Sequence, residues 1–316
     1  MSARRRIDVH QHVVPPRYAA WLRAKGVQDA GGRELPEWSV EEALRVMDAH
    51  GIAKAILSVS TPGVHPIPGK RDDAEGRALA RELNEFAAGV VAAHPARFGF
   101  FATLTLPDAP GAVAEATYAL DHLGAAGVIL LANAQGEYLG APEHEPLFAE
   151  LNRRRAVVFV HPSTLSGPGV TGIPAFAADF LLDTTRAGFR LVQSGAVRRH
   201  PQLRIILAHA GGFLPYASHR LLVTLLGQGG RAPDDILDDL RSFYFDTALS
   251  GSPAALPSLL AFAKPGHVLF GSDWPYAPAP VVAYFTSQLD GYAALDAAGH
   301  AAIDSESAAA LFEKET

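Results

Sequence analysis

The stretch Val157-Val158-Phe159-Val160 is a continuous apolar run, rich in β-branched residues, that ends directly before His161. Seven more runs of this kind recur along the chain, at residues 7–9, 55–59, 98–102, 128–131, 205–208, 243–245 and 268–270. Continuous apolar runs, in place of a strict apolar–polar alternation, are typical of parallel strands that are buried on both faces. The pattern therefore predicts eight buried parallel strands.

The segments between these runs carry helix signals. Ser39 and Glu42 form a capping box at the start of one such segment, and elsewhere apolar residues recur at helical spacing. The helical patterns cover residues 40–47, 74–93, 145–154 and 213–226. Eightfold strand–helix alternation predicts an α/β fold, a (β/α)8 TIM barrel that forms a single domain over residues 1–316. A doubly wound open sheet is the rival, but no glycine-rich phosphate loop follows the first strand.

No linker rich in proline or serine divides the sequence into domains. The stretch richest in glycine and proline, residues 163–175, follows the fifth predicted strand. Because barrels carry functional loops at such positions, we interpret this stretch as an active-site loop. Residues 300–314 are predicted to form a helical tail that packs over one end of the barrel.

The composition excludes several classes of protein. The chain has 316 residues, of which 48% are hydrophobic and 19% are charged, and its formal net charge is -6. These values exclude a disordered or collagenous chain and give no electrostatic footprint for nucleic acid. No stretch approaches 18 uninterrupted apolar residues, so we expect no membrane partner. The sequence contains no cysteine and no secretory signal pattern, and we expect a cytoplasmic enzyme acting on a small molecule.

Residues able to bind a metal stand at the ends of four predicted strands: His10, His12, His161, His209 and Asp273. The carboxyl ends of barrel strands converge on the face that carries the chemistry, and His10 and His12, two apart on one strand, should both face the barrel axis. Three or four imidazoles with one carboxylate form a ligand set for Zn2+ or a similar divalent ion. A single histidine at a strand end is more often structural, but the joint placement favours a metal site.

Four motifs that contain these residues follow one another over nearly the whole chain. They are Ile7-Asp8-Val9-His10-Gln11-His12-Val13-Val14-Pro15-Pro16, Val158-Phe159-Val160-His161-Pro162, Ile206-Leu207-Ala208-His209-Ala210-Gly211-Gly212 and Leu269-Phe270-Gly271-Ser272-Asp273-Trp274-Pro275. With this ordered set the chain resembles the amidohydrolase superfamily, specifically its aminocarboxymuconate-semialdehyde decarboxylase-like branch. Residues 183–186 and 188–195 look like the subgroup that contains 6-methylsalicylate decarboxylase and related aromatic-acid decarboxylases.

The resemblance implies a metal enzyme with a defined ligand set. One divalent ion, with Zn2+ expected and Mn2+ as the alternative, would be held by His10, His12, His161 and Asp273. His209 would act beside the ion as a general acid or base. Many hydrolases of the superfamily hold two metals, bridged by a carboxylated lysine at the end of the fourth strand. Residues 127–134 contain no lysine, which favours a single metal.

The implied reaction is the non-oxidative decarboxylation of a small hydroxybenzoate-type acid, such as a 6-methylsalicylate-like compound. The ion would chelate the carboxylate and ortho-hydroxyl oxygens, while Asp273 would protonate the ring carbon. Arg186 is a candidate for pairing with the substrate carboxylate, with a surface charge as an equal alternative. Further candidates for substrate contact are Trp274, Phe176, Phe180, His65 and Asn133, and core packing is the alternative for the aromatic residues.

Two other functions stay open at this point. A mononuclear hydrolase of a lactone or another ester-like bond would use the ion to lower the pKa of a bound water, with Asp273 or His209 as the base. A catalytically inactive barrel would serve as a binding protein, but intact ligands at all four positions disfavour it. The resemblance also suggests a homodimer or a higher homo-oligomer.

Overall fold

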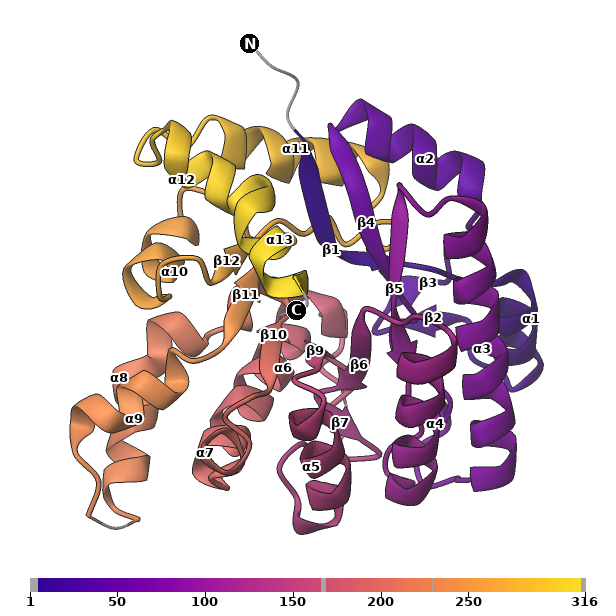
Figure 1. The fold of residues 1–316 in the computed structure, drawn as a ribbon, viewed down its shortest axis with the longest axis horizontal. Coiled ribbons are helices and arrows are strands. Elements are labelled where there is room, and N and C mark those ends of the chain that lie inside the picture. The colour runs from indigo at the N-terminus through magenta and orange to yellow at the C-terminus, as the bar shows by residue number, and fades with distance from the viewer. Residues whose placement is uncertain (1–4, 166–168, 229, 314–316) are drawn as a thin grey trace.

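The protein is described by a computed structural model that covers residues 5–165, 169–228 and 230–313. Its main sheet consists of parallel strands that pair in chain order around a barrel (Figure 1). The eight strands are β1 (Arg6–His12), β4 (Ile52–Ser58), β5 (Phe98–Thr103), β6 (Gly127–Leu131), β9 (Val157–His161), β10 (Arg204–Leu207), β11 (Tyr244–Asp246) and β12 (Val268–Leu269). Each overlaps one of the predicted apolar runs, and the predicted (β/α)8 barrel is confirmed.

The chain that follows β12 closes the barrel against β1. The N–H of Val9 donates to the carbonyl of Phe270 at 3.0 Å, and the N–H of His12 donates to the carbonyl of Trp274 at 2.7 Å. Gln11 and Trp274 form an isolated parallel bridge. The segment around residue 273 is thereby fixed beside the histidines at the end of β1, although more than 250 residues separate them in the sequence.

The helices lie outside the strands (Figure 1), and those expected from the sequence are present. These are α2 (Val40–Ala49), α3 (Asp73–Ala93), α5 (Glu145–Arg153) and α8 (Leu214–Leu226). At the start of α2, Ser39 Oγ accepts the Glu42 N–H at 3.2 Å, which confirms half of the capping box. Further helices are α1 (Pro16–Ala24), α4 (Ala109–His122), α6 (Ala175–Gln193), α7 (Ala196–Arg199), α9 (Pro233–Leu240), α10 (Leu256–Phe262), α11 (Ala279–Asp290), α12 (Ala297–Ala301) and α13 (Ser307–Phe312).

Two small antiparallel hairpins were not predicted from the sequence. One pairs β2 (Asp29–Ala30) with β3 (Arg33–Glu34), and the other pairs β7 (Asn133–Ala134) with β8 (Glu137–Tyr138). Each strand has two residues, which is too short to show an alternation of apolar and polar side chains. The first hairpin nevertheless contributes to the candidate site, as described below.

An apolar cluster fills the inside of the barrel. Its strand residues are Val9, Ile56, Phe101, Ile129, Val157, Phe159, Ile206 and Leu269, and Ala208 joins them directly after β10. Side chains from strands all around the sheet can contact one another in this way only across the interior. Ala308 and Leu311 of α13 belong to the same cluster, and the Leu311 carbonyl accepts from Arg204, the first residue of β10. Therefore α13 packs where the strands begin, and the polar groups gather at the opposite end.

The two segments that the sequence singled out are described only in part. Residues 166–168 of the predicted loop at 163–175, and residue 314 of the predicted tail, lie outside the described residues. In the described part of the loop, the Ser163 N–H donates to Asp183 on α6 at 2.8 Å, which ties the end of β9 to that helix.

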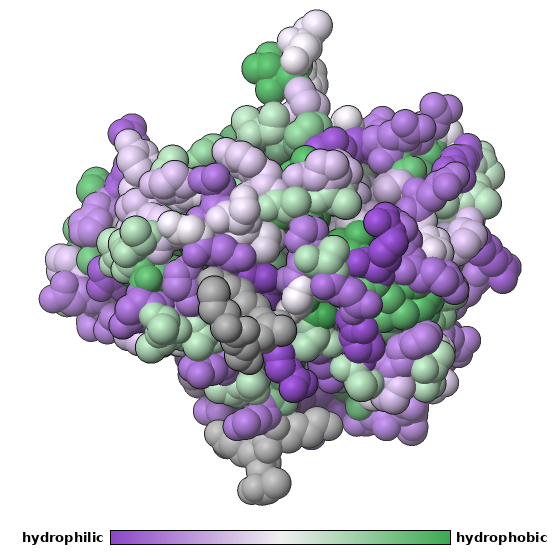
Figure 2. Space-filling view, turned by 90° about the horizontal axis from the view of Figure 1, so that it is seen from above, coloured by the Kyte–Doolittle hydropathy of each residue, from purple (hydrophilic) through white to green (hydrophobic). Residues whose placement is uncertain are grey.

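The face seen in Figure 2 is covered mainly by hydrophilic residues, with hydrophobic residues scattered among them. Among the described residues, no helix combines the length and the apolar character that a membrane crossing requires.

Candidate metal centre

A bulge in β1 turns two histidines into the barrel. Three residue steps on β1, from Asp8 to Gln11, match two steps on the neighbouring β4. Val9 belongs to the apolar interior, and the next side chain, His10, also lies inside, with its ring 4.9 Å from that of Phe159. In a regular strand, neighbouring side chains point to opposite faces, so His10 would lie outside. The extra residue therefore places the histidines at the end of β1 on the inner side.

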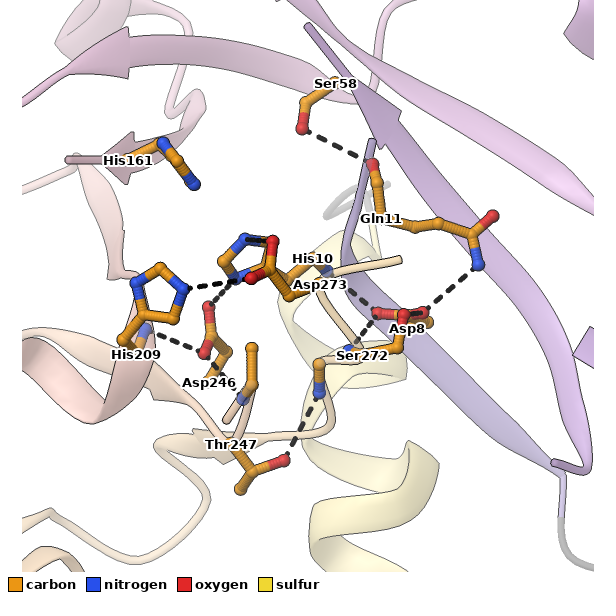
Figure 3. Close-up of polar contacts among 12 residues, drawn as sticks. Asp8, His10, Gln11, Ser58, His161, His209, Asp246, Thr247, Ser272 and Asp273 are labelled. Carbon is orange, nitrogen blue, oxygen red and sulfur yellow. Dashed lines mark hydrogen bonds and ion pairs between the residues drawn. The ribbon is translucent and has the colours of Figure 1, made fainter. Parts of the chain in front are cut away.

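The strand ends bring His10, His161, His209 and Asp273 together in a buried cluster (Figure 3), in which one ligand atom of each lies within 4.8 Å of the others. His10 Nε2 lies 3.2 Å from Asp273 Oδ1, and His209 Nε2 lies 3.5 Å from Asp273 Oδ2. His12 borders the cluster, since its Nε2 is 3.2 Å from Asp273 Oδ1 and 3.0 Å from His10 Nε2. All five residues predicted from the strand ends meet here, and the cluster indicates a divalent metal site.

The far side of three imidazoles is occupied by hydrogen-bond acceptors. His10 Nδ1 lies 2.8 Å from Asp246 Oδ2, and His161 Nδ1 lies 2.8 Å from its neighbouring carbonyl at Pro162. His12 Nδ1 lies 3.0 Å from Ser58 Oγ. A protonated Nδ1 that donates to such a group leaves the Nε2 lone pair free toward the cluster, as a metal ligand requires. The residues present therefore fit a bound divalent ion.

His209 differs from the other histidines of the cluster. Its Nδ1 is buried and has no hydrogen-bond partner among the described residues. Its backbone has a φ of 54°, and Asp273 has a φ of 61°, a region that non-glycine residues rarely adopt. Hydrogen bonds hold both conformations: the His209 N–H donates to Asp246 at 2.9 Å, and the Asp273 N–H donates to the His10 carbonyl at 2.8 Å. Strained backbone of this kind is concentrated at functional sites.

The charges of the cluster are strongly coupled. Burial alone would raise the pKa of Asp273, but the nearby His10 and the hydrogen bonds of His10, His12 and His209 hold it well below its ordinary value. Burial, followed by the neighbouring His12 and His10, holds the pKa of His161 well below its ordinary value. A neutral imidazole and an ionised carboxylate are the forms that bind a metal. The pKa shifts of these two residues favour their ligand forms, whereas at His10 burial is outweighed by Asp246 and Asp273, which raise its pKa to about 10 in the metal-free protein.

A cavity of about 300 Å³ opens onto the cluster. Its walls are formed by Ala30, Arg33, Ser60, Thr61, His161, Phe176, Ala177, Phe180, Leu181, His209, Leu249, Ser250, Asp273, Tyr276, Val281 and Phe285. Two of the predicted aromatic contacts, Phe176 and Phe180, are among them. Small-molecule sites are typically concave and largely apolar, with a few polar groups that orient the ligand. This cavity has that character.

The structure does not bring Arg186 or Asn133 to this cavity. Arg186 is an exposed residue of α6 and does not line the cavity over the metal cluster. The amide nitrogen of Asn133 donates to both carboxylate oxygens of Asp183, at 3.0 and 3.1 Å, and to the carbonyl of Thr164. Asn133 thus braces the end of β9 against α6, and it lines a neighbouring cavity of about 550 Å³ instead.

His65 and Trp274 also lie apart from the metal cavity. His65 lines the neighbouring cavity, but its Nε2 is buried without a partner among the described residues, and its ring packs against Gly76 of α3. Trp274 is buried in the apolar core between strands and helices, and its carbonyl pairs with β1. Trp274 is thus a core residue, as the alternative interpretation of this residue expected.

Two residues of the site were missed in the sequence. Asp246, the last residue of β11, is fully buried and contacts both His10 and His209. Its position directly after an apolar run was the available signal. Arg33 enters the metal cavity from β3, with its guanidinium carbon 4.6 Å from the centre of the Phe176 ring. No sequence pattern pointed to it, because the short hairpin that carries it was not recognised.

Comparison with known proteins agrees with this geometry. A family model for amidohydrolases matches residues 7–314. The chain is similar to the 6-methylsalicylic acid decarboxylase acuB of Aspergillus aculeatus, with 41% identity over 300 residues that cover 92% of this chain and 90% of the relative.

Solved structures share the fold over almost the whole chain. A crystal structure of an amidohydrolase II protein has a TM-score of 0.90 and 30% identity, covering 97% of this chain and 99% of the other. A 2,6-dihydroxybenzoate decarboxylase, crystallised with 2,6-dihydroxybenzoate, has a TM-score of 0.79 and 25% identity, covering 99% of each chain.

Proposed function

The chain belongs to the amidohydrolase family, and on this premise we propose that it is a metal-dependent decarboxylase that releases CO2 from a small hydroxybenzoate-type acid. The observation that carries this proposal is the buried cluster of imidazoles and one carboxylate at the base of a cavity of about 300 Å³. A largely apolar cavity of this size suits a single substituted benzene ring. By its similarity to acuB, we propose a 6-methylsalicylate-like acid as the substrate.

We propose that His10, His12, His161 and Asp273 hold one ion. The imidazole Nε2 atoms and the carboxylate are ligands that Zn2+ accepts readily, and we expect Zn2+, with Mn2+ as the alternative. When bound, the ion supplies positive charge that stabilises the negative charge developing on the substrate oxygens. His209, whose Nδ1 has no acceptor among the described residues, is assigned to proton transfer beside these ligands.

Asp273 is the group that we propose to deliver a proton to the ring. Its low pKa keeps it ionised in the free protein, so it has to take up a proton before it can donate one. His209 Nε2, 3.5 Å from Asp273 Oδ2, is placed to supply that proton. The proton adds to the ring carbon that carries the carboxylate. The carbon–carbon bond then breaks, CO2 leaves, and the electron pair of that bond restores the aromatic ring.

We propose that Arg33, in place of Arg186, contacts the substrate. It lines the metal cavity, and no acidic partner for it is found within the described residues. A guanidinium forms strong paired hydrogen bonds with a carboxylate or phenolate. We therefore propose that Arg33 binds an anionic oxygen of the substrate, while Phe176 and Phe180 pack against the ring.

We also propose that two copies of the chain pair through α8. Phe213, directly before this helix, and Tyr216 and Val223 within it are exposed by 41%, 87% and 68% and are spaced to form one stripe. Exposed apolar side chains on one side of a helix mark contact surfaces, and this side, which also presents the exposed His219 and Arg220, can meet its own copy about a two-fold axis.

The proposed activity is tested with a panel of substrates. The metal-loaded protein is incubated with 6-methylsalicylate, 2,6-dihydroxybenzoate, benzoate and a set of lactones, while CO2 and the product phenol are quantified. We expect equimolar CO2 and phenol from an ortho-hydroxybenzoate, no turnover of benzoate, and no turnover by an Asp273→Asn variant. Lactone opening without CO2 release from any acid would overturn the proposal in favour of a hydrolase.

A further inference from the structure

We infer that Asp246 is a positioning residue that fixes two members of the metal centre with one carboxylate, and this inference rests on the proposed function. Asp246 ends β11 and is fully buried. Figure 3 shows it between His10, on β1, and His209, beyond the end of β10. It makes no contact with the metal cavity, so its influence on the reaction passes through these two residues.

The two carboxylate oxygens have different tasks. Oδ2 lies 2.8 Å from Nδ1 of His10. Oδ1 accepts two backbone N–H groups, those of His209 and Ala248, each at 2.9 Å. The first contact acts on a side chain of the metal cluster, and the second holds the backbone of His209 at its positive φ. One residue therefore couples the orientation of His10 to the conformation of His209.

The contact with His10 selects the tautomer of the imidazole. A carboxylate oxygen accepts hydrogen bonds and cannot donate, so the proton of a neutral His10 is held on Nδ1. The lone pair then lies on Nε2, which is 3.2 Å from Asp273 Oδ1 and faces the cluster. A histidine with its proton on Nε2 could not bind an ion on that side. Such acceptors behind a ligand histidine are known to strengthen metal binding generally, and their loss costs 10- to 100-fold in affinity.

An Asp246→Asn variant would keep the backbone hydrogen bonds at Oδ1 but change the tautomer of His10. The two N–H groups at Oδ1 require an acceptor, so the amide oxygen of Asp246→Asn has to face His209 and Ala248. The amide NH2 then faces His10 Nδ1, which can now only accept a hydrogen bond. His10 is driven to the Nε2–H tautomer, which points a proton at the metal position. The variant keeps the backbone hydrogen bonds but loses His10 Nε2 as a ligand of the metal ion.

The test measures metal affinity, independently of decarboxylation. Metal-stripped wild type and Asp246→Asn are titrated with Zn2+ and, separately, Mn2+ in competition with a chromophoric chelator. We expect the affinity of Asp246→Asn to be 10- to 100-fold weaker, with a melting temperature in the metal-free state close to that of wild type. The matched control is Asp183→Asn, because Asp183 is also a buried carboxylate but contacts no histidine of the cluster; its affinity should stay within twofold of wild type.

Each outcome decides the inference. Equal affinities for wild type and Asp246→Asn, or equal losses in the Asp246→Asn and Asp183→Asn variants, would overturn it. If wild type binds neither Zn2+ nor Mn2+, the proposed metal site and this inference both fail. If the protein does not decarboxylate the acids but the affinity difference persists, the proposed reaction fails and this inference stands. If Asp246→Asn does not fold, long-range nitrogen-15 NMR of metal-free wild type, recorded at a pH at which His10 is neutral, decides the same point. A proton on Nδ1 of His10 supports the inference, and a proton on Nε2 contradicts it.

Discussion

Arg33 and Arg186 lead to opposite expectations for substrate binding. Arg33 lines the metal cavity, whereas Arg186 is exposed on α6. Loss of a charged hydrogen bond to the substrate costs about 1.5–3 kcal/mol, or roughly 10- to 100-fold in affinity. We expect Arg33→Ala to raise KM for the aromatic acid by that factor with unchanged metal content. Arg186→Ala should leave KM within twofold of wild type in steady-state assays of CO2 release.

The reverse pattern would contradict the assignment of Arg33. An unchanged KM in Arg33→Ala together with a raised KM in Arg186→Ala would return the role of carboxylate clamp to α6. An Arg33→Lys variant serves as a further control. It keeps the charge but loses the paired geometry of the guanidinium, and it should bind with intermediate affinity.

The ligand candidates could be read from the sequence because they follow apolar runs whose ends converge in a barrel. Their supporting residues could not be read in that way. Asp246 also follows an apolar run, but its task depends on His10, a residue more than 200 positions away on a strand that does not pair with β11. The candidate Arg186 shows a different limit: the sequence places it in a helix but does not say which side of that helix meets the cavity.

At the scale of elements, α5 offers a test of pH dependence. Glu150 pairs with Arg153 on the same helix and with Arg154 directly after its end, and these hydrogen bonds lower the pKa of Glu150 to about 2. The unfolded state therefore binds the proton at a higher pH than the folded state, and the stabilisation is complete above pH ~4.5 and is lost as the pH falls toward 2. We expect Glu150→Gln to lower the free energy of unfolding by about 1 kcal/mol at pH 7.

Urea denaturation of the metal-free protein at pH 7, 5, 4 and 3 checks this expectation. The difference between wild type and Glu150→Gln should shrink below pH ~4.5. The control is Glu85→Gln, because Glu85 is exposed on helix α3 and has no ion pair within 4.0 Å in the described part of the chain. A difference that is constant over the whole range would show that the Glu150 contacts act through packing and not through charge.

The helices and strands could be predicted from the sequence where they are long or carry a clear apolar or capping pattern. Each of the eight apolar runs became a strand, and the capping residue Ser39 begins α2 as expected. The bulge in β1 was not predictable, because Val9 and His10 are neighbours and a regular strand would separate their faces. The inward placement of His10 and His12 was therefore predicted correctly, but their position depends on an irregularity that simple alternation does not contain.

At the scale of the whole molecule, the exposed stripe along α8 predicts association. We expect the protein to sediment as a dimer at micromolar concentration, and Val223→Glu to sediment as a monomer because it places a charge in the contact. The control is Tyr284→Glu, since Tyr284 is an exposed aromatic residue on α11, away from the stripe. A monomeric wild type, or a Val223→Glu variant that stays dimeric, would exclude this contact.

The barrel explains why residues from both ends of the chain form one centre. Closure places the segment after β12 against β1, and α13 covers the opposite end with apolar side chains. The sequence predicted the number and order of the strands, since each is a local pattern. It did not predict that closure would occur through backbone pairing of residues 9–12 with the chain beyond β12, because that pairing is set by the tilt of the complete sheet.

The most direct measurement is a titration of the metal-stripped protein with Zn2+ or Mn2+, in which bound ion and the rate of CO2 release from 6-methylsalicylate are recorded together. We predict no CO2 release without added ion, and a rate that rises in proportion to bound ion until it reaches a plateau at about one ion per chain. Full activity in the stripped protein, or a plateau only after a second ion has bound, would contradict the single metal centre on which this account depends.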